Sequence, residues 1–195
     1  LTPEVEAHLE SQGVKMAGYD DVRKGIKEYA EYNILLDPNE TNYTLSRLVD
    51  VQEVIRHKSP IPAMKAIKNE AEIRGYRSAM LKDGIALVKF LRWLKPAVEA
   101  GGQTEISIDK KLTSLRAEQP LFRDISFDTI AGYGAHGAIV HYEATPETDI
   151  PLEPHGLLLL DSGAQYQDGT TDITRTIALG PVSDYEKHIY TLVLK

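Results

Sequence analysis

The chain has 195 residues, of which 42% are hydrophobic and 26% charged, the composition of an ordinary soluble globular protein. Its formal net charge of -7, without a run of Lys or Arg, argues against a nucleic-acid partner, because such partners are usually bound by clustered basic side chains. The absence of cysteine excludes disulfides and thiolate metal sites, so any metal must be held by oxygen or imidazole. No stretch approaches the roughly 18 apolar residues of a membrane span. We therefore expect a cytoplasmic protein with no membrane partner.

The first 60 residues predict short, alternating helices and strands. Helical patterns cover residues 2–12 and 20–32, and strand patterns cover residues 14–17 and 33–37. This alternation is typical of an α/β domain. Too few strands are present to complete a sheet, so we interpret this region as part of something larger.

Two long helices are predicted next, after the segment Ser59–Pro62, whose prolines favour an extended linker. The first helix begins at a capping box formed by Asn69 and Glu72 and is expected to stop at Pro96. The second covers residues 104–119. Both carry an apolar face, so we expect them to cover one face of a sheet.

Strands and turns are predicted after Pro120. The four leucines at 157–160 predict a strand that is buried on both faces. A hairpin is expected within residues 166–178, turning near Asp168 and Gly169. Residues 183–194 begin a final helix.

Asp161 and Asp172 are the candidate metal ligands. The leucine strand runs directly into Asp161, where a buried carboxylate is costly without a partner or a cation. Asp172 lies in a β-branched run that predicts an adjacent strand, so the two carboxylates can converge and bind a divalent cation. A second interpretation stays open on these grounds: Asp161 and Asp168 are turn residues, and Asp172 pairs with Arg175.

A resemblance favours the metal interpretation. The segment Asp161–Thr176, which reads DSGAQYQDGTTDITRT, closely resembles the signature of aminopeptidase P within the pita-bread metallopeptidase family. The segment Gly137–Tyr142, which reads GAIVHY, resembles the substrate-binding strand of the same family. Residues 65–94 and 102–107 are similar to its first helices.

The resemblance implies a mixed α/β (α+β) chain in which residues 1–60 are the C-terminal part of a creatinase-like α/β domain. Residues 61–195 would be the N-terminal half of a pita-bread catalytic domain. The parent protein would be a metal-dependent Xaa-Pro aminopeptidase, which releases the first residue of peptides that carry proline in second position. The chain is expected to be an internal fragment that lacks a His and two Glu ligands. The fragment itself is therefore expected to bind metal weakly and to be inactive.

The family pattern also implies residue roles. Asp161 would bind one of two divalent ions and Asp172 would bridge both, most simply Mn²⁺, with Co²⁺ or Zn²⁺ as substitutes. His141 would face the peptide substrate and stabilise charge that develops at the carbonyl oxygen. A core histidine bonded to a backbone group is the other interpretation of His141. A homodimer is expected for the full-length protein.

Three other histidines predict little chemistry. His136 is interpreted as a solvated loop residue, His155 as a turn residue and His188 as a surface residue of the last helix. Three other functions stay open: a prolidase that cuts Xaa-Pro dipeptides, a metal-free creatinase-type hydrolase, and a non-catalytic peptide-binding module. Both Asp161 and Asp172 are present, which argues against the last two.

Overall fold

The computed structural model describes residues 1–29, 31–49 and 54–195. Its contacts divide the chain into two compact units, Leu1–Ile67 and Lys68–Lys195, which are described separately. Within the described residues, no helix combines the length and the apolar character that crossing a bilayer requires.

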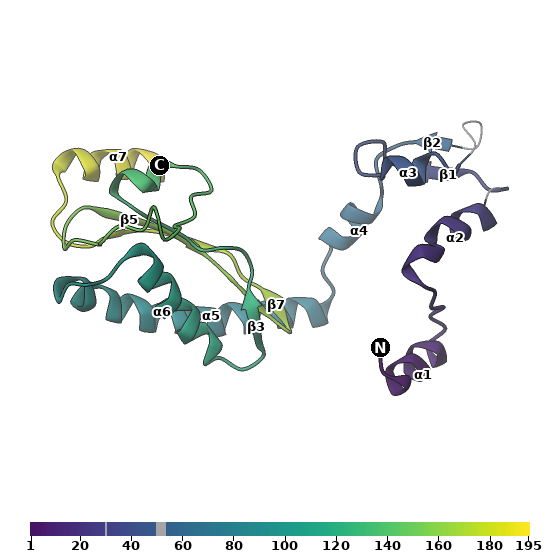
Figure 1. Cartoon of the computed structure of the whole chain (residues 1–195), viewed down its shortest axis with the longest axis horizontal. Coiled ribbons are helices and arrows are strands. Elements are labelled where there is room, and N and C mark those ends of the chain that lie inside the picture. The colour runs from purple at the N-terminus through teal and green to yellow at the C-terminus, as the bar shows by residue number, and fades with distance from the viewer. Residues whose placement is uncertain (30, 50–53) are drawn as a thin grey trace. The chain divides into compact units, whose positions relative to one another are not determined.

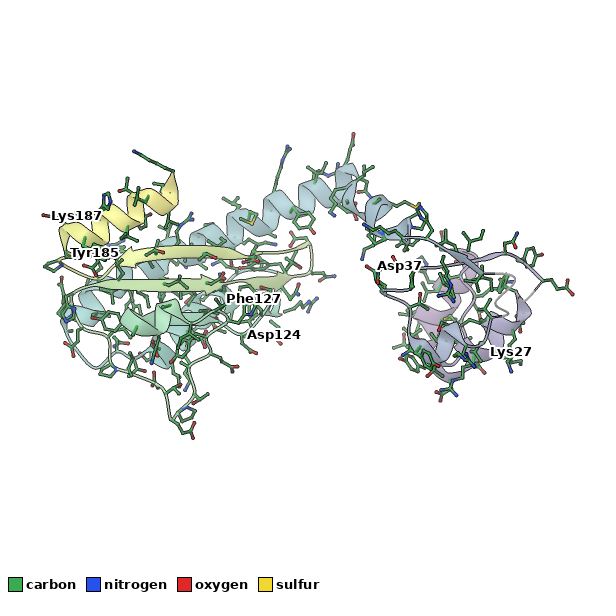
Figure 2. The ribbon with its side chains drawn as sticks, turned by 90° about the horizontal axis from the view of Figure 1, so that it is seen from above. Lys27, Asp37, Asp124, Phe127, Tyr185 and Lys187 are labelled. Atoms are coloured by element: carbon green, nitrogen blue, oxygen red, sulfur yellow. The ribbon has the colours of Figure 1, made fainter. Side chains whose placement is uncertain are left out.

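The first unit is built from short elements: α1 (Pro3–Ser11), η1 (Tyr19–Asp21), α2 (Val22–Glu28), β1 (Ile34–Leu36), α3 (Tyr43–Ser46), β2 (Val54–Arg56) and α4 (Ile61–Ala66). Strands β1 and β2 pair in parallel. Asp37, at the end of β1 (Figure 2), accepts hydrogen bonds from the backbone N–H groups of Ser59 and Asn39, both at 3.0 Å. These two bonds lower the pKa of the Asp37 carboxyl and tie the ends of the two strands together.

The sequence prediction for this unit is partly confirmed. The helix expected at residues 2–12 and the strand expected at residues 33–37 are present. The strand expected at residues 14–17 is wrong, because these residues are exposed and no described strand pairs with them. The helix expected at residues 20–32 ends at Glu28, and residue 30 lies outside the described residues.

The proline segment between the strands and the long helix is helical instead of extended. Pro60 is the N-cap of α4 and Pro62 lies in its first turn. Proline is accepted there because the first N–H groups of a helix have no intrahelical acceptor.

The second unit (Figure 1) contains two small sheets, three α-helices and one short 3₁₀ helix. Its elements follow in the order α5 (Glu70–Glu99), α6 (Glu105–Ala117), β3 (Phe122–Ile125), β4 (Ile130–Tyr133), η3 (Gly134–Ala138), β5 (Leu157–Ser162), β6 (Ala164–Tyr166), β7 (Gly169–Thr170), β8 (Ile173–Ala178) and α7 (Asp184–Leu194). Strand β5 is central in an antiparallel sheet between β4 and β8. The other sheet has the order β3-β6-β7.

Helix α5 begins where the sequence predicts. The Asn69 side chain accepts the N–H of Glu72 at 2.9 Å, and the Glu72 carboxylate accepts the N–H of Asn69 at 2.8 Å. The expected stop at Pro96 is wrong, because the helix continues to Glu99. Pro96 lies in the last turn, and its carbonyl still accepts the N–H of Ala100 at 3.0 Å.

The main core lies between the two long helices and one face of the sheet. Helices α5 and α6 lie together on one side of β5, and α7 lies on the other side (Figure 1). The expected cover of one sheet face by two helices is therefore confirmed. The core combines residues of α5, α6 and the sheet, among them Phe90, Leu94, Ile108, Leu112, Leu158 and Leu160.

The two faces of β5 differ in burial. Leu158, Leu160 and Ser162 are 0%, 1% and 0% exposed, whereas the alternate residues Leu157, Leu159 and Asp161 are only partly buried. The expectation of a strand buried on both faces is therefore wrong. The half-buried side of β5, here called the outer face, carries Asp161.

Candidate functional site

Asp161 lies near the end of β5, on the outer face. It pairs with Ile130 of β4 and with Thr174 of β8 in the strand register. Its Oδ1 atom is buried and has no hydrogen-bond partner, a feature that only the Thr129 and Ser162 hydroxyls share among the described side chains. Those hydroxyls are neutral, whereas a carboxylate oxygen is the costlier atom to bury unpaired. An unpaired buried carboxylate oxygen is a suitable ligand atom for a hard divalent cation.

Asp172 directly precedes β8. Ile173 is the register partner of Ser162, and Thr174 is the partner of Asp161. Side chains two positions apart in a strand project to the same side, so the strand alternation would direct Asp172 to the face that carries Asp161. The predicted pairing of the two segments as adjacent strands is thus confirmed. Asp172 is exposed, so its side chain is open to solvent.

The alternative pairing of Asp172 with Arg175 has no support in the structure. Arg175 Nη1 donates to the carbonyl of Thr174 at 3.2 Å. In the part of the chain that the structure describes, no ion pair joins Asp172 to Arg175.

The segment between the two carboxylates is held in a fixed shape by close backbone contacts. A Cβ at Gly163 would lie 2.0 Å from the carbonyl oxygen of Thr171 and 2.2 Å from Ser126 Oγ, so only glycine fits. The N–H of Ala164 donates to Thr171 Oγ1 at 3.0 Å, and the N–H of Thr171 donates to the carbonyl of Ala164 at 2.9 Å. These contacts fix where the chain leaves Asp161 and where it returns to Asp172.

A buried ion pair supports the same segment from the core side. Arg116 and Asp83 are both 0% exposed, and the guanidinium makes two bonds to the carboxylate, at 2.7 and 3.0 Å. Arg116 Nη1 also donates to the carbonyl of Gly163 at 3.3 Å, and the Tyr166 hydroxyl donates to Asp83 at 3.1 Å. Burial, followed by the Asp83 charge, raises the pKa of Tyr166, so this hydroxyl keeps its proton.

Asp168 lies in the predicted turn, between β6 and β7. Its carboxylate is paired with Lys82 of α5, whose Nζ lies 2.6 Å from its Oδ1. The hydrogen bond from Lys82 lowers the pKa of the Asp168 carboxyl. The interpretation of Asp168 as a turn residue is confirmed.

His141 lies in a turn, not in a strand. The strand expected at Gly137–Tyr142 is wrong: residues 134–138 form the short 3₁₀ helix η3, and a turn follows at residues 139–141. His141 is exposed and has a φ of 57°. The alternative of a core histidine is therefore excluded by its exposure.

Helix η3 folds back onto the sheet because β4 carries a glycine. A Cβ at Gly132 would lie 2.8 Å from the N atom of Gly137, so a side chain there would displace η3. Gly137 in turn faces the Cβ of Leu159, at 3.5 Å from its own ideal Cβ position. Leu159 and Asp161 share the outer face, so η3 lies on the same side of the sheet as Asp161.

The sequence does not predict a cluster of polar side chains that forms beside η3. Glu105 is 0% exposed, and its carboxylate accepts hydrogen bonds from His136 Nδ1 at 3.0 Å and from the Tyr142 hydroxyl at 2.7 Å. The interpretation of His136 as a solvated loop residue is therefore wrong. The sequence does not indicate this contact. An acidic residue such as Glu105 is common in the first turn of a helix, so its type and position alone predict no further partner.

His155 and His188 agree with their predicted places. His155 lies in a bend before β5 and receives a hydrogen bond on its carbonyl from the Tyr133 hydroxyl at 2.9 Å. His188 is exposed on α7. Within the described ranges, no group of three or more His, Asp or Glu side chains lies close enough to hold a metal ion.

Comparison with family models identifies the class of protein to which this fold belongs. The model of metallopeptidase family M24 matches residues 74–195, and the model of the creatinase/prolidase N-terminal domain matches residues 1–72. The chain therefore belongs to metallopeptidase family M24. The expected combination of creatinase-like and pita-bread folds is confirmed.

Within this family the chain is similar to aminopeptidases P. Aminopeptidase P2 of Arabidopsis thaliana is 37% identical over 227 residues, covering 100% of this chain and 32% of that protein. A probable Xaa-Pro aminopeptidase P of Arthroderma benhamiae is 39% identical over 207 residues, covering 100% of this chain and 30% of that protein. The predicted resemblance is confirmed. The chain spans about a third of the length of these curated relatives.

Two solved structures match this chain over most of its length. The X-prolyl aminopeptidase of Caenorhabditis elegans, described as a cytosolic enzyme with a di-nuclear active site, matches with a TM-score of 0.86 and 32% identity, over 95% of this chain and 32% of that one. The Xaa-Pro dipeptidase of Bacillus anthracis matches with a TM-score of 0.72 and 28% identity, over 93% of this chain and 50% of that one.

Proposed function

We propose that the protein containing this chain is a metal-dependent Xaa-Pro aminopeptidase, which releases the N-terminal residue from peptides with proline in second position. The observation that carries this proposal is the buried, unpaired Oδ1 of Asp161, next to the segment that ends in Asp172. The names of the relatives supply the substrate class. Because the chain spans about a third of those relatives, the activity is proposed for the whole protein.

A dedicated enzyme for such peptides has a chemical reason. Proline has no backbone N–H and restricts the conformation of the residue before it. A peptidase that depends on that N–H or on a free backbone conformation handles the Xaa-Pro bond poorly. A site with its own recognition of the ring avoids this difficulty.

Asp161 and Asp172 are proposed as the residues of this chain that would hold two divalent ions. The donor set in this chain is all oxygen, which suits Mn²⁺, and Mn²⁺ is the ion we propose. When bound, such an ion pair would polarise the scissile carbonyl and activate a water molecule. The family pattern adds a His and two Glu ligands, so the pair in this chain supplies two of five.

His141 is proposed to contact the peptide. It is exposed, and it follows η3, which lies on the outer face together with Asp161. From there an imidazole can donate a hydrogen bond to the carbonyl oxygen, where negative charge develops in the transition state.

Location and assembly are also proposed. We propose a cytosolic protein, supported by the cytosolic relative and by the cysteine-free sequence. A homodimer follows from the family resemblance, and light scattering on the whole protein would test it.

The test is an assay of the whole protein with Mn²⁺ on an Xaa-Pro-Yaa tripeptide and an Xaa-Pro dipeptide. We expect the first residue of the tripeptide to be released, and Asp161→Asn and Asp172→Asn to lower kcat/KM by more than about a thousand-fold, since a metal supplies several kcal/mol of transition-state stabilisation. Unchanged activity in both variants would refute the metal assignment. Cleavage of the dipeptide alone would identify a prolidase.

A further inference from the structure

A single carboxylate accepts hydrogen bonds from both ends and from the middle of residues 133–142, the loop that carries His141. Glu105 is the first residue of α6 and is 0% exposed. Its Oε1 accepts the N–H of Tyr133 at 2.8 Å, both of its oxygens lie 3.0 Å from His136 Nδ1, and its Oε2 accepts the Tyr142 hydroxyl at 2.7 Å. These donors lie just before η3, within it, and just after His141.

The donors also support one another. The rings of His136 and Tyr142 are packed together, with centroids 4.5 Å apart and planes tilted by 36°. Burial raises the pKa of Tyr142, so its hydroxyl keeps its proton and remains a donor at neutral pH. The loop is thus closed around Glu105 by side chains and backbone together.

His141 lies beside this cluster in an uncommon backbone conformation. Its φ of 57° falls in the left-handed region, which few residues other than glycine occupy. Such a conformation persists where surrounding contacts fix it, and it points to a functional constraint. Tyr142, the next residue, is 7% exposed and bonded to Glu105, while His141 itself is exposed.

We propose that Glu105, His136 and Tyr142 are positioning residues, which together hold His141 on the side of the sheet that carries Asp161. The proposal rests on the proposed function, because it assigns the cluster to the substrate contact of His141. A simpler role, in which the cluster only satisfies buried polar groups, predicts effects on stability that do not depend on His141. The two roles therefore differ in whether the loss of activity on mutating the cluster depends on the presence of His141.

The variants remove one donor at a time. Tyr142→Phe deletes the hydroxyl and keeps the ring that packs on His136. His136→Leu deletes the ring donor, and His136→Asn retains one, since the amide nitrogen is bonded to Cγ as Nδ1 is. Tyr185→Phe, on an exposed tyrosine of α7, is the matched control.

The first readout is a double-mutant cycle on tripeptide hydrolysis by the whole Mn²⁺-loaded protein. We expect Tyr142→Phe and His136→Leu to lower kcat/KM by about 10- to 100-fold, the scale that loss of positioning produces. His136→Asn should stay within about three-fold of wild type, and Tyr185→Phe should have no effect. In a His141→Ala background the Tyr142→Phe and His136→Leu losses should shrink to less than about two-fold. Equal losses in both backgrounds, or none in the wild type, would overturn the proposal.

The second readout needs no activity. In metal-free protein with ¹³C-labelled histidine, the His141 signal is identified by its absence in His141→Ala. Tyr142→Phe should shift that signal and leave the His188 signal in place, and an unchanged His141 signal would overturn the proposal. A wild-type protein without tripeptide hydrolysis would refute the proposed function, and the His141 signal would still decide whether the cluster holds this loop.

Discussion

The two faces of β5 show how one strand can serve both stability and chemistry. Leu158, Leu160 and Ser162 face α5 and α6 and are almost fully buried, whereas Leu157, Leu159 and Asp161 face the side of η3 and α7. The charged pair on the core side, Asp83 and Arg116, is paired by two hydrogen bonds, whereas Asp161 Oδ1 on the outer face has no partner. The residues of the core side therefore serve stability, whereas the outer face keeps a carboxylate oxygen that no protein group satisfies.

The largest stability effect is expected at the buried ion pair. Arg116→Met leaves Asp83 buried and unpaired, so it should lower the free energy of unfolding of the whole protein by about 3–5 kcal/mol. The double variant Asp83→Leu/Arg116→Met removes both charges and should recover part of that loss, since the Tyr166 hydroxyl and the Gly163 carbonyl still lose their partners. Urea unfolding measures both, and a double variant as unstable as the single one would contradict this account.

A second effect should separate the two faces directly. Leu158→Ala creates a cavity in the core and should cost about 3 kcal/mol of unfolding free energy. Leu159→Ala, one residue on and on the outer face, makes the same chemical change at a half-buried position and should cost about 1 kcal/mol. Equal losses of unfolding free energy in the two variants, measured by urea unfolding, would contradict the difference in burial between the two faces.

Asp161 itself should oppose folding when no metal is bound. Asp161→Asn replaces an unpaired buried carboxylate oxygen by a neutral amide, so in metal-free protein it should raise the unfolding free energy by about 1 kcal/mol. Thermal unfolding in the presence of a chelator measures this change. A clear loss of stability would show that the carboxylate is a structural partner rather than a metal ligand.

The smallest effect concerns the turn between the two carboxylates. The Lys82 contact holds the pKa of Asp168 below its ordinary value of about 3.9, so its stabilisation is present above that pH and is lost as the pH falls through the lowered pKa. Asp168→Asn should therefore be less stable than wild type at pH 7 and pH 5, and the difference should shrink below about pH 4. A difference that is constant down to pH 3 would contradict the assignment.

The sequence predicts the features that depend on near neighbours. The capping box of Asn69 and Glu72, the leucine strand before Asp161 and the turn at Asp168 all follow from residues a few positions apart. The strand expected at residues 14–17 is wrong because a strand exists only through a partner, which local sequence cannot supply.

The sequence predicts the part of the site that lies on neighbouring strands, but not the contacts between distant residues. Asp161 and Asp172 were expected on adjacent strand segments, and the register agrees. The contact between Glu105 and His136 spans 31 positions, and it depends on η3 folding back over Gly132. A distant contact of this kind has no local pattern, so the sequence around His136 predicts only a loop residue.

The central claim, that the outer face of β5 binds metal through Asp161, is tested most directly by calorimetric titration of the whole metal-free protein with Mn²⁺. We predict that Asp161→Asn weakens binding by more than about 100-fold, beyond what loss of a residue that only supports a ligand costs. Asp184→Asn, on an exposed carboxylate of α7, should bind as the wild type does. Equal affinity and stoichiometry in Asp161→Asn and the wild type would contradict the account.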